Sequence, residues 1–374
     1  MEDPLLAAAQ RNFDQAEIYR FHSVSDPVSF EANRLKEAIH RESSGVALRV
    51  IADGQVGFSS TTNPEHEEQL VDRVAAVAPY GDQARFTFSN PASVPEVPVF
   101  DRNVTDVSFD EMAHMGQTLI DRLRSKWPEL TCEASIGKSR AEVKVVNTTG
   151  VNLSFEQTGY YLWVSGTLIR GTDMLHVGDA FSSSQVVDVG ERLIASVLQQ
   201  LESAKDLAHP PLGEVPIMFT PKGFASCLLS PLLAGFSGKK IADASSPLSR
   251  KMGDQIVSER ITIRDNPLIP FATGSRPFDD EGMPSENITL IENGHLVSFL
   301  FDLRTAGLTG ARSTASAHRA LSTPPSPDVS VIDVEPGDCP LNDMLSGIKE
   351  GLVVEQVLGA GQGNELGGDF KVNV

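Results

Sequence analysis

The sequence predicts an α+β protein with two domains: an N-terminal α+β domain with a curved antiparallel sheet, and a C-terminal domain that is mostly β with few helices. The chain of 374 residues is longer than one hydrophobic core usually supports, which favours two domains. Between residues 130 and 170, short apolar segments alternate with turn residues, as in consecutive antiparallel strands. A Pro-rich break from His209 to Gly213 separates the halves. We therefore place the domains at residues 1–208 and 209–374.

Turn and cap signals define the elements of the N-terminal half. Gly45 to Thr61 is expected to form a hairpin that turns at Asp53-Gly54, because the apolar residues before the turn occupy alternate positions. Asn63-Pro64-Glu65 is typical of a helix start, and Ser108 with Glu111 has the spacing of a capping box. The expected helices cover about residues 4–12, 63–78, 108–126 and 189–207. The other expected strands cover residues 16–21, 29–36, 130–136, 142–147, 152–157 and 160–170, with turns at Thr149-Gly150 and Thr158-Gly159.

The C-terminal half contains short strands and few helices. A helix is expected to begin at Thr220-Pro221, and Pro231 should kink or split it, because proline lacks the N–H that an interior turn needs. Asn293-Gly294 between apolar runs predicts a tight hairpin, since both central residues of such a turn take positive φ. A second helix is expected over residues 341–349, and a glycine-rich loop over 359–368. The remaining expected strands cover residues 215–219, 256–263, 329–334 and 351–358.

An acidic loop, Asp279-Asp280-Glu281-Gly282, precedes the second-half hairpin. Carboxylate oxygens are ligands for calcium or magnesium, but this loop lacks the ligand spacing of an EF-hand. A solvated acidic turn is the alternative that composition favours. Downstream, a loop of small residues contains Ser313 and Thr314, and His318 and Arg319 follow it.

Composition restricts the class of protein. The formal net charge of −19 argues against nucleic-acid binding, which requires clusters of Lys and Arg. Three scattered cysteines are too few for a disulfide framework and indicate reduced thiols. The N-terminal segment lacks the basic region of a signal peptide, and no apolar run reaches the ~18–20 residues of a membrane span. We expect a cytoplasmic protein that binds neither membranes nor nucleic acid.

The order of these motifs resembles that of the TldD/PmbA family, whose members are known as modulators of DNA gyrase and as TldD-TldE metallopeptidases. Members carry an Asp-Asp-Glu-Gly loop, a Leu-Ile-Glu-Asn-Gly hairpin and a Ser-Thr-rich loop that ends in Arg. The matching residues here are Phe278 to Gly282, Leu290 to Gly294 and Ser313 to Arg319. The resemblance extends from Gly45 near the N-terminus to Phe370, and the order of the motifs is more specific than any one of them.

The zinc motif of the TldD branch is the main departure from the family pattern. In that branch a helix carries His-Glu, three residues and a second His, so that two imidazoles hold zinc and the Glu acts as general base. Aligned on Pro221, these positions fall on Leu229, Ser230 and Ala234, which cannot act as ligand or base. The branch's late Cys ligand has no counterpart, because Cys339 precedes the final strand. The resemblance implies the PmbA (TldE) branch, with no catalytic residue, metal ligand or cofactor in this chain.

The first hypothesis for function follows from this branch. The chain would be the non-zinc subunit of a heteromeric cytoplasmic metallopeptidase that degrades or matures unfolded peptides, while a TldD-type partner holds the zinc. It would form a wall of the chamber and capture peptide at an extended strand edge, without being catalytic on its own. The residues expected to line the subunit interface or bind peptide are Asp279, Asp280, Glu281, Gly282, Ser313, Thr314, His318 and Arg319. The alternative for both loops is that they only shape the fold.

Two other hypotheses stay open from the sequence. In one, the chain is a homodimeric binding or scaffold protein of the gyrase-modulator type with no peptidase role. In the other, it hydrolyses peptides alone with an unrecognised metal. Members of the family usually continue past the Gly-Asp-Phe motif, which here ends at Phe370, into further strands. The C-terminal strands are therefore expected to be absent or truncated.

Overall fold

The computed structural model describes residues 3–209, 211–357, 363–364 and 369–370. The chain forms two compact units. The first comprises Met1–Asp206, Pro267–Ser285 and Arg319–Pro325, and the second comprises Leu207–Asn266, Glu286–His318 and Ser326–Val374. The predicted boundary after residue 208 lies beside the point where the chain first leaves the first unit. Two later segments return to that unit, and they carry the acidic loop and Arg319.

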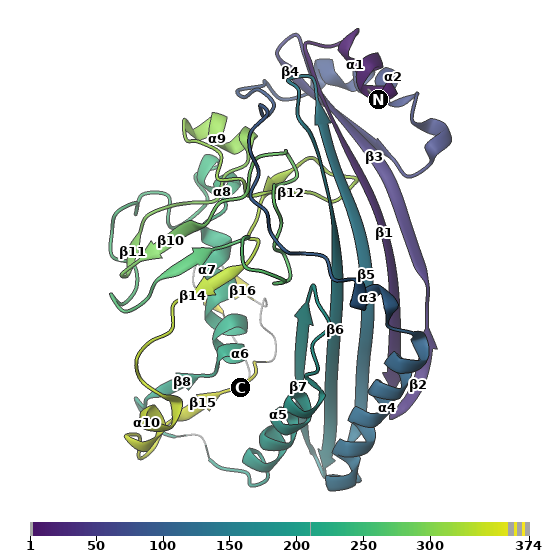
Figure 1. Ribbon diagram of the computed structural model, residues 1–374. Coiled ribbons are helices and arrows are strands. Elements are labelled where there is room, and N and C mark those ends of the chain that lie inside the picture. The colour runs from purple at the N-terminus through teal and green to yellow at the C-terminus, as the bar shows by residue number, and fades with distance from the viewer. Residues whose placement is uncertain (1–2, 210, 358–362, 365–368, 371–374) are drawn as a thin grey trace. The chain divides into compact units, whose positions relative to one another are not determined.

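A seven-stranded antiparallel sheet forms the framework of the first unit, in the order β4-β3-β1-β5-β6-β7, and β2 pairs with the far end of β1. Its long strands bend along their length (Figure 1). The predicted hairpin at Asp53-Gly54 is confirmed, and both residues have positive φ, of 48° and 76°. The strands are β1 (Gln15–Glu31), β2 (Arg34–Ala38), β3 (Arg41–Ala52), β4 (Gln55–Thr61), β5 (Thr131–Asn147), β6 (Asn152–Arg170) and β7 (Asp173–Ser183).

The strands predicted for this unit outside the Asp53-Gly54 hairpin are wrong in their bounds, and residues 16–21 are only the first part of β1. β5 and β6 are continuous strands of 17 and 19 residues, and Thr158-Gly159 is not a turn, because the two strands pair with each other along almost their whole length. Residues 29–36 are not one strand, because the chain reverses at Ala32 and Asn33, which both take positive φ. β7 is a further strand at the edge of the sheet.

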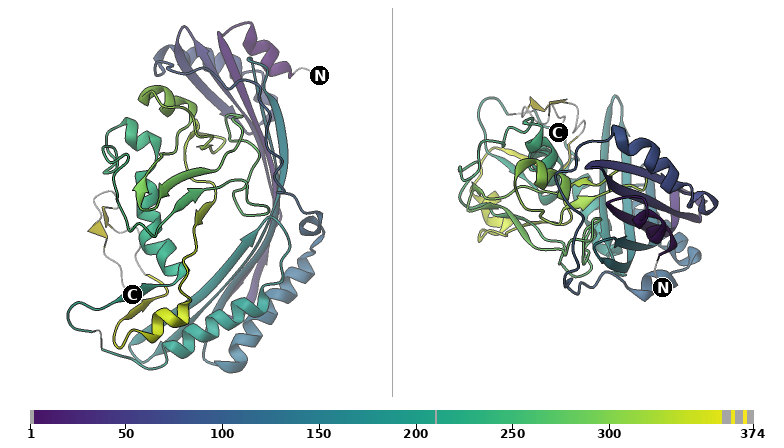
Figure 2. Two further views of the ribbon diagram at one scale, coloured as in Figure 1. Left: turned by 60° about the vertical axis from the view of Figure 1, so that its left-hand side comes forward. Right: turned by 90° about the horizontal axis from the view of Figure 1, so that it is seen from above.

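Two pairs of helices cover the same face of this sheet. At one end, α1 (Pro4–Gln10) and α2 (Leu70–Val77) pack on a cluster that includes Ile18. At the other end, α4 (Phe109–Lys126) and α5 (Gly190–Ser203) pack on a cluster that includes Val28, and the predicted capping box begins α4. Ile18 and Val28 are an even number of positions apart in β1, so both point to this face. Figures 1 and 2 show the two pairs at opposite ends of the long strands.

The segment before α4 contains short helical turns and a long extended stretch. The turns are η1 (Pro64–His66), η2 (Ala78–Tyr80) and α3 (Arg102–Asp106). Asn63 caps η1 as predicted, because its side chain accepts a hydrogen bond from Glu65 N–H. On the sheet face opposite the helices, a smaller cluster contains Tyr19, Ala47 and Val145, and Phe278 packs into it. Phe278 immediately precedes the acidic loop, so this contact brings the loop to the sheet.

The second unit is built from short strands and short helices, as predicted. A four-stranded sheet has the order β11-β10-β9-β14, and β8 pairs with β15 in parallel. Two further two-stranded pairs are β12 with β13 and β16 with β17. The strands are β8 (Ile217–Phe219), β9 (Ile263–Asp265), β10 (Ile288–Glu292), β11 (His295–Leu296), β12 (Ala317–His318), β13 (Ser326–Pro327), β14 (Ile332–Val334), β15 (Leu352–Val354), β16 (Gly363–Asn364) and β17 (Asp369–Phe370).

The helical run after Thr220 changes type before Pro231. It passes from α6 (Pro221–Phe224) through a π-helical turn, η3 (Ala225–Leu229), to α7 (Ser230–Gly235), so the predicted interruption is confirmed. Proline has no N–H and its ring conflicts with the carbonyl four residues earlier, which a widened turn relieves. The other helices are α8 (Gly238–Ala242), α9 (Leu303–Thr309) and α10 (Leu341–Ser346).

The hairpin at Asn293-Gly294 is also confirmed, with φ of 47° and 82°. The strand predicted over 256–263 is wrong, because Ile256 and Ile261 bond to the turn at Gly294 rather than to a ladder. The glycine-rich loop predicted over 359–368 lies almost wholly outside the described residues. Among the described helices, none combines the length and apolarity that a membrane crossing needs.

Candidate functional site

The acidic loop is a tight turn held by its own first carboxylate. Asp279 Oδ1 accepts hydrogen bonds from the backbone N–H groups of Glu281 and Met283, each at 2.9 Å, as Asp side chains commonly do in turns. Gly282 has a φ of 74°, and a Cβ there would lie 3.0 Å from Val151 Cγ1. Glycine is therefore required at this position both for its backbone conformation and for space.

The next carboxylates join a buried series of ion pairs on the sheet. Glu281 Oε1 lies 2.7 Å from Arg49 Nη1, and Arg49 Nη2 lies 2.9 Å from Glu17 Oε2. Glu17 Oε1 lies 2.6 Å from Arg319 Nη2, and Asp280 Oδ2 accepts a hydrogen bond from Arg319 N–H at 2.8 Å. We call Glu17, Arg49, Asp280, Glu281 and Arg319 the buried charge cluster. All five belong to the first unit, and Asp280 has the most exposed side chain, at 14%.

Strand register explains why two of these charges meet. Glu17 in β1 lies directly opposite Arg49 in β3, and opposite charges at such positions attract. Both side chains point away from the helix-covered face, because their neighbours Ile18 and Leu48 belong to the core beneath α1 and α2.

Aromatic rings cover the parts of the guanidinium groups that ion pairs leave. The Arg49 guanidinium lies 4.9 Å from the centroid of the Phe88 ring, and that of Arg319 lies 4.7 Å from the Tyr19 ring. Such contacts stabilise a cation through the ring quadrupole. They lie beside atoms with no hydrogen-bond partner among the described residues, namely Arg49 Nε and Arg319 Nε and Nη1.

Burial and charge act in opposite directions on the carboxylates. Burial raises the pKa of Glu17, but Arg49 and Arg319 outweigh it, so this pKa lies below its ordinary value. The pKa of Asp280 is raised, because burial outweighs the attraction of Arg276 and Arg319. Glu17 is therefore held as a carboxylate between two arginines, whereas burial disfavours the ionised form of Asp280.

The buried charge cluster can fix the acidic loop to the sheet, but most of its side chains are not accessible to a substrate. Apart from Asp280, its side chains are at most 3% exposed, which leaves little access for a peptide or a partner subunit. This burial favours the structural alternative for the loop. A role of Asp279, Asp280, Glu281 or Gly282 at an interface stays a prediction.

The Ser-Thr loop belongs to the second unit and bonds within it. Thr314 Oγ1 accepts a hydrogen bond from Phe301 N–H at 2.7 Å, and both Ser313 and Thr314 are buried. His318 Nε2 lies 3.3 Å from Ser330 Oγ. The structure therefore unites Asp280, Glu281 and Arg319, whereas the contacts described for Ser313, Thr314 and His318 lie in the other unit. Their proposed contact with peptide or partner also stays a prediction.

Pro277 and Phe278, which precede the acidic loop, also line an apolar hollow of about 440 Å³ in the first unit. One wall is the extended segment 94–100, and another is residues 153–156 of β6. Pro277 and Phe278 close a third side, and Phe278 packs edge-on against Phe155 with ring centroids 5.0 Å apart. Concave apolar surfaces of this size are typical of binding sites for side chains.

The three residues that the sequence predicts at the zinc-motif positions do not fit a zinc ion. Leu229 ends η3, and Ser230 and Ala234 lie in α7, so the three positions offer two hydrocarbon side chains and one hydroxyl. Zinc in proteins takes imidazole, thiolate or carboxylate donors. Over residues 3–209, 211–357, 363–364 and 369–370, no three His, Cys, Asp or Glu residues converge as metal ligands do.

Sequence reasoning missed Glu17, Arg49 and Tyr19 as members of the site. The available signal was a charge in the middle of each of two apolar strand segments, Ala16 to Phe21 and Val46 to Ile51. A charged residue on a strand's covered face requires a buried partner. That signal predicts an ion pair between Glu17 and Arg49. It does not predict Glu281 as the second partner of Arg49, because Glu281 is 232 positions away in the sequence.

Comparison with known proteins connects this arrangement to one family. A model described as PmbA/TldA metallopeptidase C-terminal domain matches residues 212–374, and one described as PmbA/TldA metallopeptidase domain 1 matches residues 16–78. The crystal structure of TldE from Thermococcus kodakarensis is similar, with a TM-score of 0.87 at 25% identity, over 95% of this chain and 82% of that chain.

Two relatives from Haemophilus influenzae match most of the sequence. One, named as a metalloprotease TldD homolog, is 23% identical over 97% of this chain and 78% of its own length. The other, named as a metalloprotease PmbA homolog, is 23% identical over 92% of this chain and 76% of its own length. Both alignments therefore span residues from each of the two units.

Proposed function

The chain belongs to the PmbA/TldD metallopeptidase family, and from this premise we propose that it is the non-zinc subunit of a two-subunit cytoplasmic peptidase. A TldD-type partner supplies the zinc, its ligands and the general base. This chain supplies surface that receives an unfolded peptide and closes a wall of the reaction chamber. The substrates are unfolded peptides that are degraded or matured.

The observation that carries this proposal is the donor set between Leu229 and Ala234. A helix that presents leucine, serine and alanine where relatives bind zinc cannot polarise water through a metal there. The fold is nevertheless that of the family, so its surfaces remain available for substrate. A division of labour between two related chains reconciles these facts.

The free edge of β7 supports a role in peptide capture. Arg170 and Asp173 pair across a two-residue turn, so the backbone groups of every second residue, Met174 to Ser182, point away from β6. At Gly178, both outward groups bind the Gln200 side-chain amide, at 3.1 Å each. Beyond Gly178, the outward N–H of Ala180 donates to Asp179 Oδ1 at 2.8 Å, whereas the outward backbone groups of Ser182 have no bond among the described residues. An extended peptide pairs with such an edge through main-chain hydrogen bonds.

The apolar hollow also supports a role in peptide capture. Most of its lining side chains are apolar, including Val94, Leu153, Phe155 and Phe278, and the lining also contains Glu96 and Glu156. A hollow of this kind accepts an apolar side chain and favours a peptide with neighbouring basic residues. Backbone pairing and one side-chain site together bind unfolded segments without requiring a defined sequence.

Co-expression with a zinc-bearing TldD-type relative from the same genome tests the proposal. The two chains should co-elute in size-exclusion chromatography, and the pair should hydrolyse an unfolded peptide faster than the relative alone. A matched control pairs the relative with an unrelated acidic protein of similar size. Separate elution, together with equal activity with and without this chain, would refute the proposal and leave the homodimeric scaffold as the better account.

A further inference from the structure

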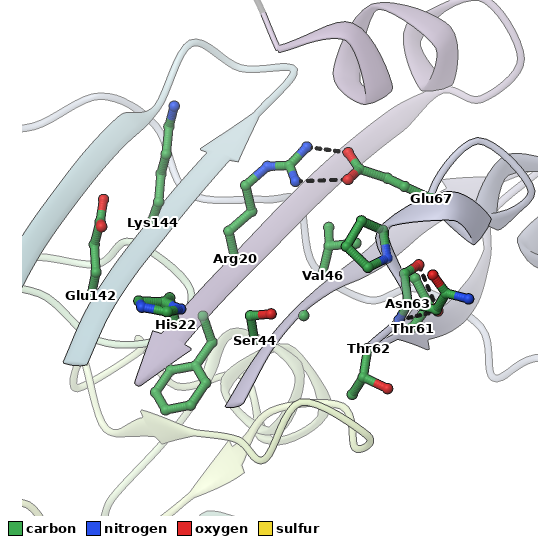
Figure 3. A pocket seen from close by; sticks show the side chains of 13 residues that line it. Arg20, His22, Ser44, Val46, Thr61, Thr62, Asn63, Glu67, Glu142 and Lys144 are labelled. Carbon is green, nitrogen blue, oxygen red and sulfur yellow. Dashed lines mark hydrogen bonds and ion pairs between the residues drawn. The ribbon is translucent and has the colours of Figure 1, made fainter. Parts of the chain in front are cut away.

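A pocket of about 360 Å³, whose lining includes several charged residues, lies on the helix-bearing face of the first unit, in the strip between the two helix pairs. Its floor is made by β1, β3 and β5 at residues 20–22, 44–46 and 142–144, and residues 61–64 form one wall. Arg20, His22, Glu142 and Lys144 stand on two neighbouring strands, and Glu67 faces Arg20 from beyond them (Figure 3). None of the functions discussed above uses this pocket.

Strand register fixes the order of the charges. Arg20 in β1 lies directly opposite Lys144 in β5, and His22 lies opposite Glu142. Like charges directly opposite each other repel, so Arg20 and Lys144 both require counter-ions. Arg20 and Lys144 therefore form a basic pair, and His22 and Glu142 form an imidazole–carboxylate pair beside it.

The protein neutralises Arg20 but not Lys144. Both guanidinium amino groups of Arg20 reach Glu67, and Arg20 Nε lies 2.9 Å from Asp3 Oδ2. Figure 3 shows Arg20 turned toward Glu67, whereas Lys144 rises from β5 with no such contact. Among the described residues, Lys144 and Glu142 have no ion pair. The pocket thus holds one ammonium and one carboxylate whose charges are not matched by the protein.

The spacing of these two groups defines the size of a complementary ligand. Glu142 and Lys144 are two positions apart in one strand, so their side chains point to the same face from Cα atoms about 7 Å apart. An extended dipeptide places its terminal charges at a similar separation, because two residues span at most about 7 Å. Ser44 in the floor and Thr61 and Asn63 in the wall carry hydroxyl and amide groups that can bond the central peptide group.

We propose that this pocket binds a zwitterionic dipeptide, with its carboxylate at Lys144 and its ammonium at Glu142. A simple anion satisfies only Lys144, and a simple cation satisfies only Glu142. A zwitterion of matching length satisfies both and adds no net charge to the pocket. Dipeptides are also a class of molecule that peptidases release, but the inference does not rest on the proposed function.

Titration of the chain alone with the dipeptide Ala-Ala tests the site by calorimetry. The unmodified dipeptide should bind, whereas its N-acetyl and C-amide forms should bind at least about tenfold more weakly, because each loses one charge-assisted contact. Free alanine and tetra-alanine should also bind at least about tenfold more weakly. Equal binding of the blocked forms, or no binding of Ala-Ala at millimolar concentration, would overturn the inference and leave the co-elution test of the peptidase pair untouched.

Two variants locate the binding to this pocket. Lys144→Met and Glu142→Gln should each raise the dissociation constant of Ala-Ala about tenfold or more. Lys126→Met and Glu129→Gln remove the same charges from exposed positions of the same unit and should leave it unchanged. Thermal unfolding verifies that each variant is folded, and Lys144→Gln replaces Lys144→Met if the latter is not. Wild-type affinity in both pocket variants contradicts the assignment.

Discussion

Replacing Arg49 by Met removes a guanidinium that bridges two buried carboxylates. Arg49 contacts Glu281 at 2.7 Å and Glu17 at 2.9 Å, and all three side chains are at most 3% exposed. Removing one partner of a buried ion pair costs about 3–5 kcal/mol, because the remaining charge stays buried. Met fills a similar length of side chain, so the cavity contribution is small. Glu17 keeps its contact with Arg319, whereas Glu281 loses its ion pair with Arg49.

A second substitution separates charge from packing. In the Arg49→Met background, Glu281→Gln removes the buried charge and should recover about 1.5 kcal/mol or more of the free energy of unfolding. Arg122→Met is the matched control, because Arg122 pairs with Glu191 at 2.8 Å but both side chains are at least half exposed. The control should cost less than about 1 kcal/mol.

Tryptophan fluorescence during urea unfolding is a suitable assay. Both tryptophans, Trp127 and Trp163, lie in the first unit, so the signal reports the unit that contains the buried charge cluster. The reasoning is refuted if Arg49→Met costs no more than Arg122→Met. It is also refuted if Glu281→Gln further destabilises the Arg49→Met chain.

Three other predictions concern the loop and the sheet edge. Gly282→Ala should lower the free energy of unfolding in urea by roughly 2–4 kcal/mol, because φ is 74° and the new Cβ meets Val151. Gly171→Ala, at φ 65° in open space, should lower it by only about 1–2 kcal/mol, and equal costs of the two substitutions contradict this reasoning. The raised pKa of Asp280 contributes stability that is present below its ordinary value of 3.8 and is lost as pH rises through the folded pKa. Asp280→Asn should therefore flatten the dependence of the free energy of unfolding on pH above 3.8. An unchanged slope excludes Asp280 as the source of this pH dependence. Ala180→Pro should weaken the binding of a fluorescent unfolded peptide about tenfold or more, because proline blocks the outward edge of β7. Binding is measured on the chain purified together with the TldD-type relative. Ala180→Val should bind the peptide like the wild type, and equal binding by both variants excludes this edge as the peptide site.

The local signals in the sequence predict much of the framework. Asn-Gly and Asp-Gly turns, the capping box at Ser108 and the interruption near Pro231 depend on neighbouring residues only, and the structure contains all of them. Strand length was harder to predict, because Gly159 resembles a turn residue but lies within a strand that pairs on both sides. Pairing between distant segments, rather than propensity, decides such positions.

The candidate site was predictable only in part, for a related reason. The acidic loop and Arg319 are recognisable as motifs, but the sequence favours a solvated turn for the loop. In the structure the loop is buried, because Arg49, from a strand more than 200 residues earlier, and Arg319 compensate its charges. A carboxylate's environment depends on these distant partners, which no local pattern contains.

Zinc analysis of this chain purified alone, and of the pair purified with a TldD-type relative, tests the proposed function most directly. The division of labour predicts no zinc above background in the single chain, about one zinc ion per pair, and hydrolysis of unfolded peptide only by preparations that contain the relative. Near-stoichiometric zinc in the single chain, with hydrolysis that a chelator abolishes, would contradict it.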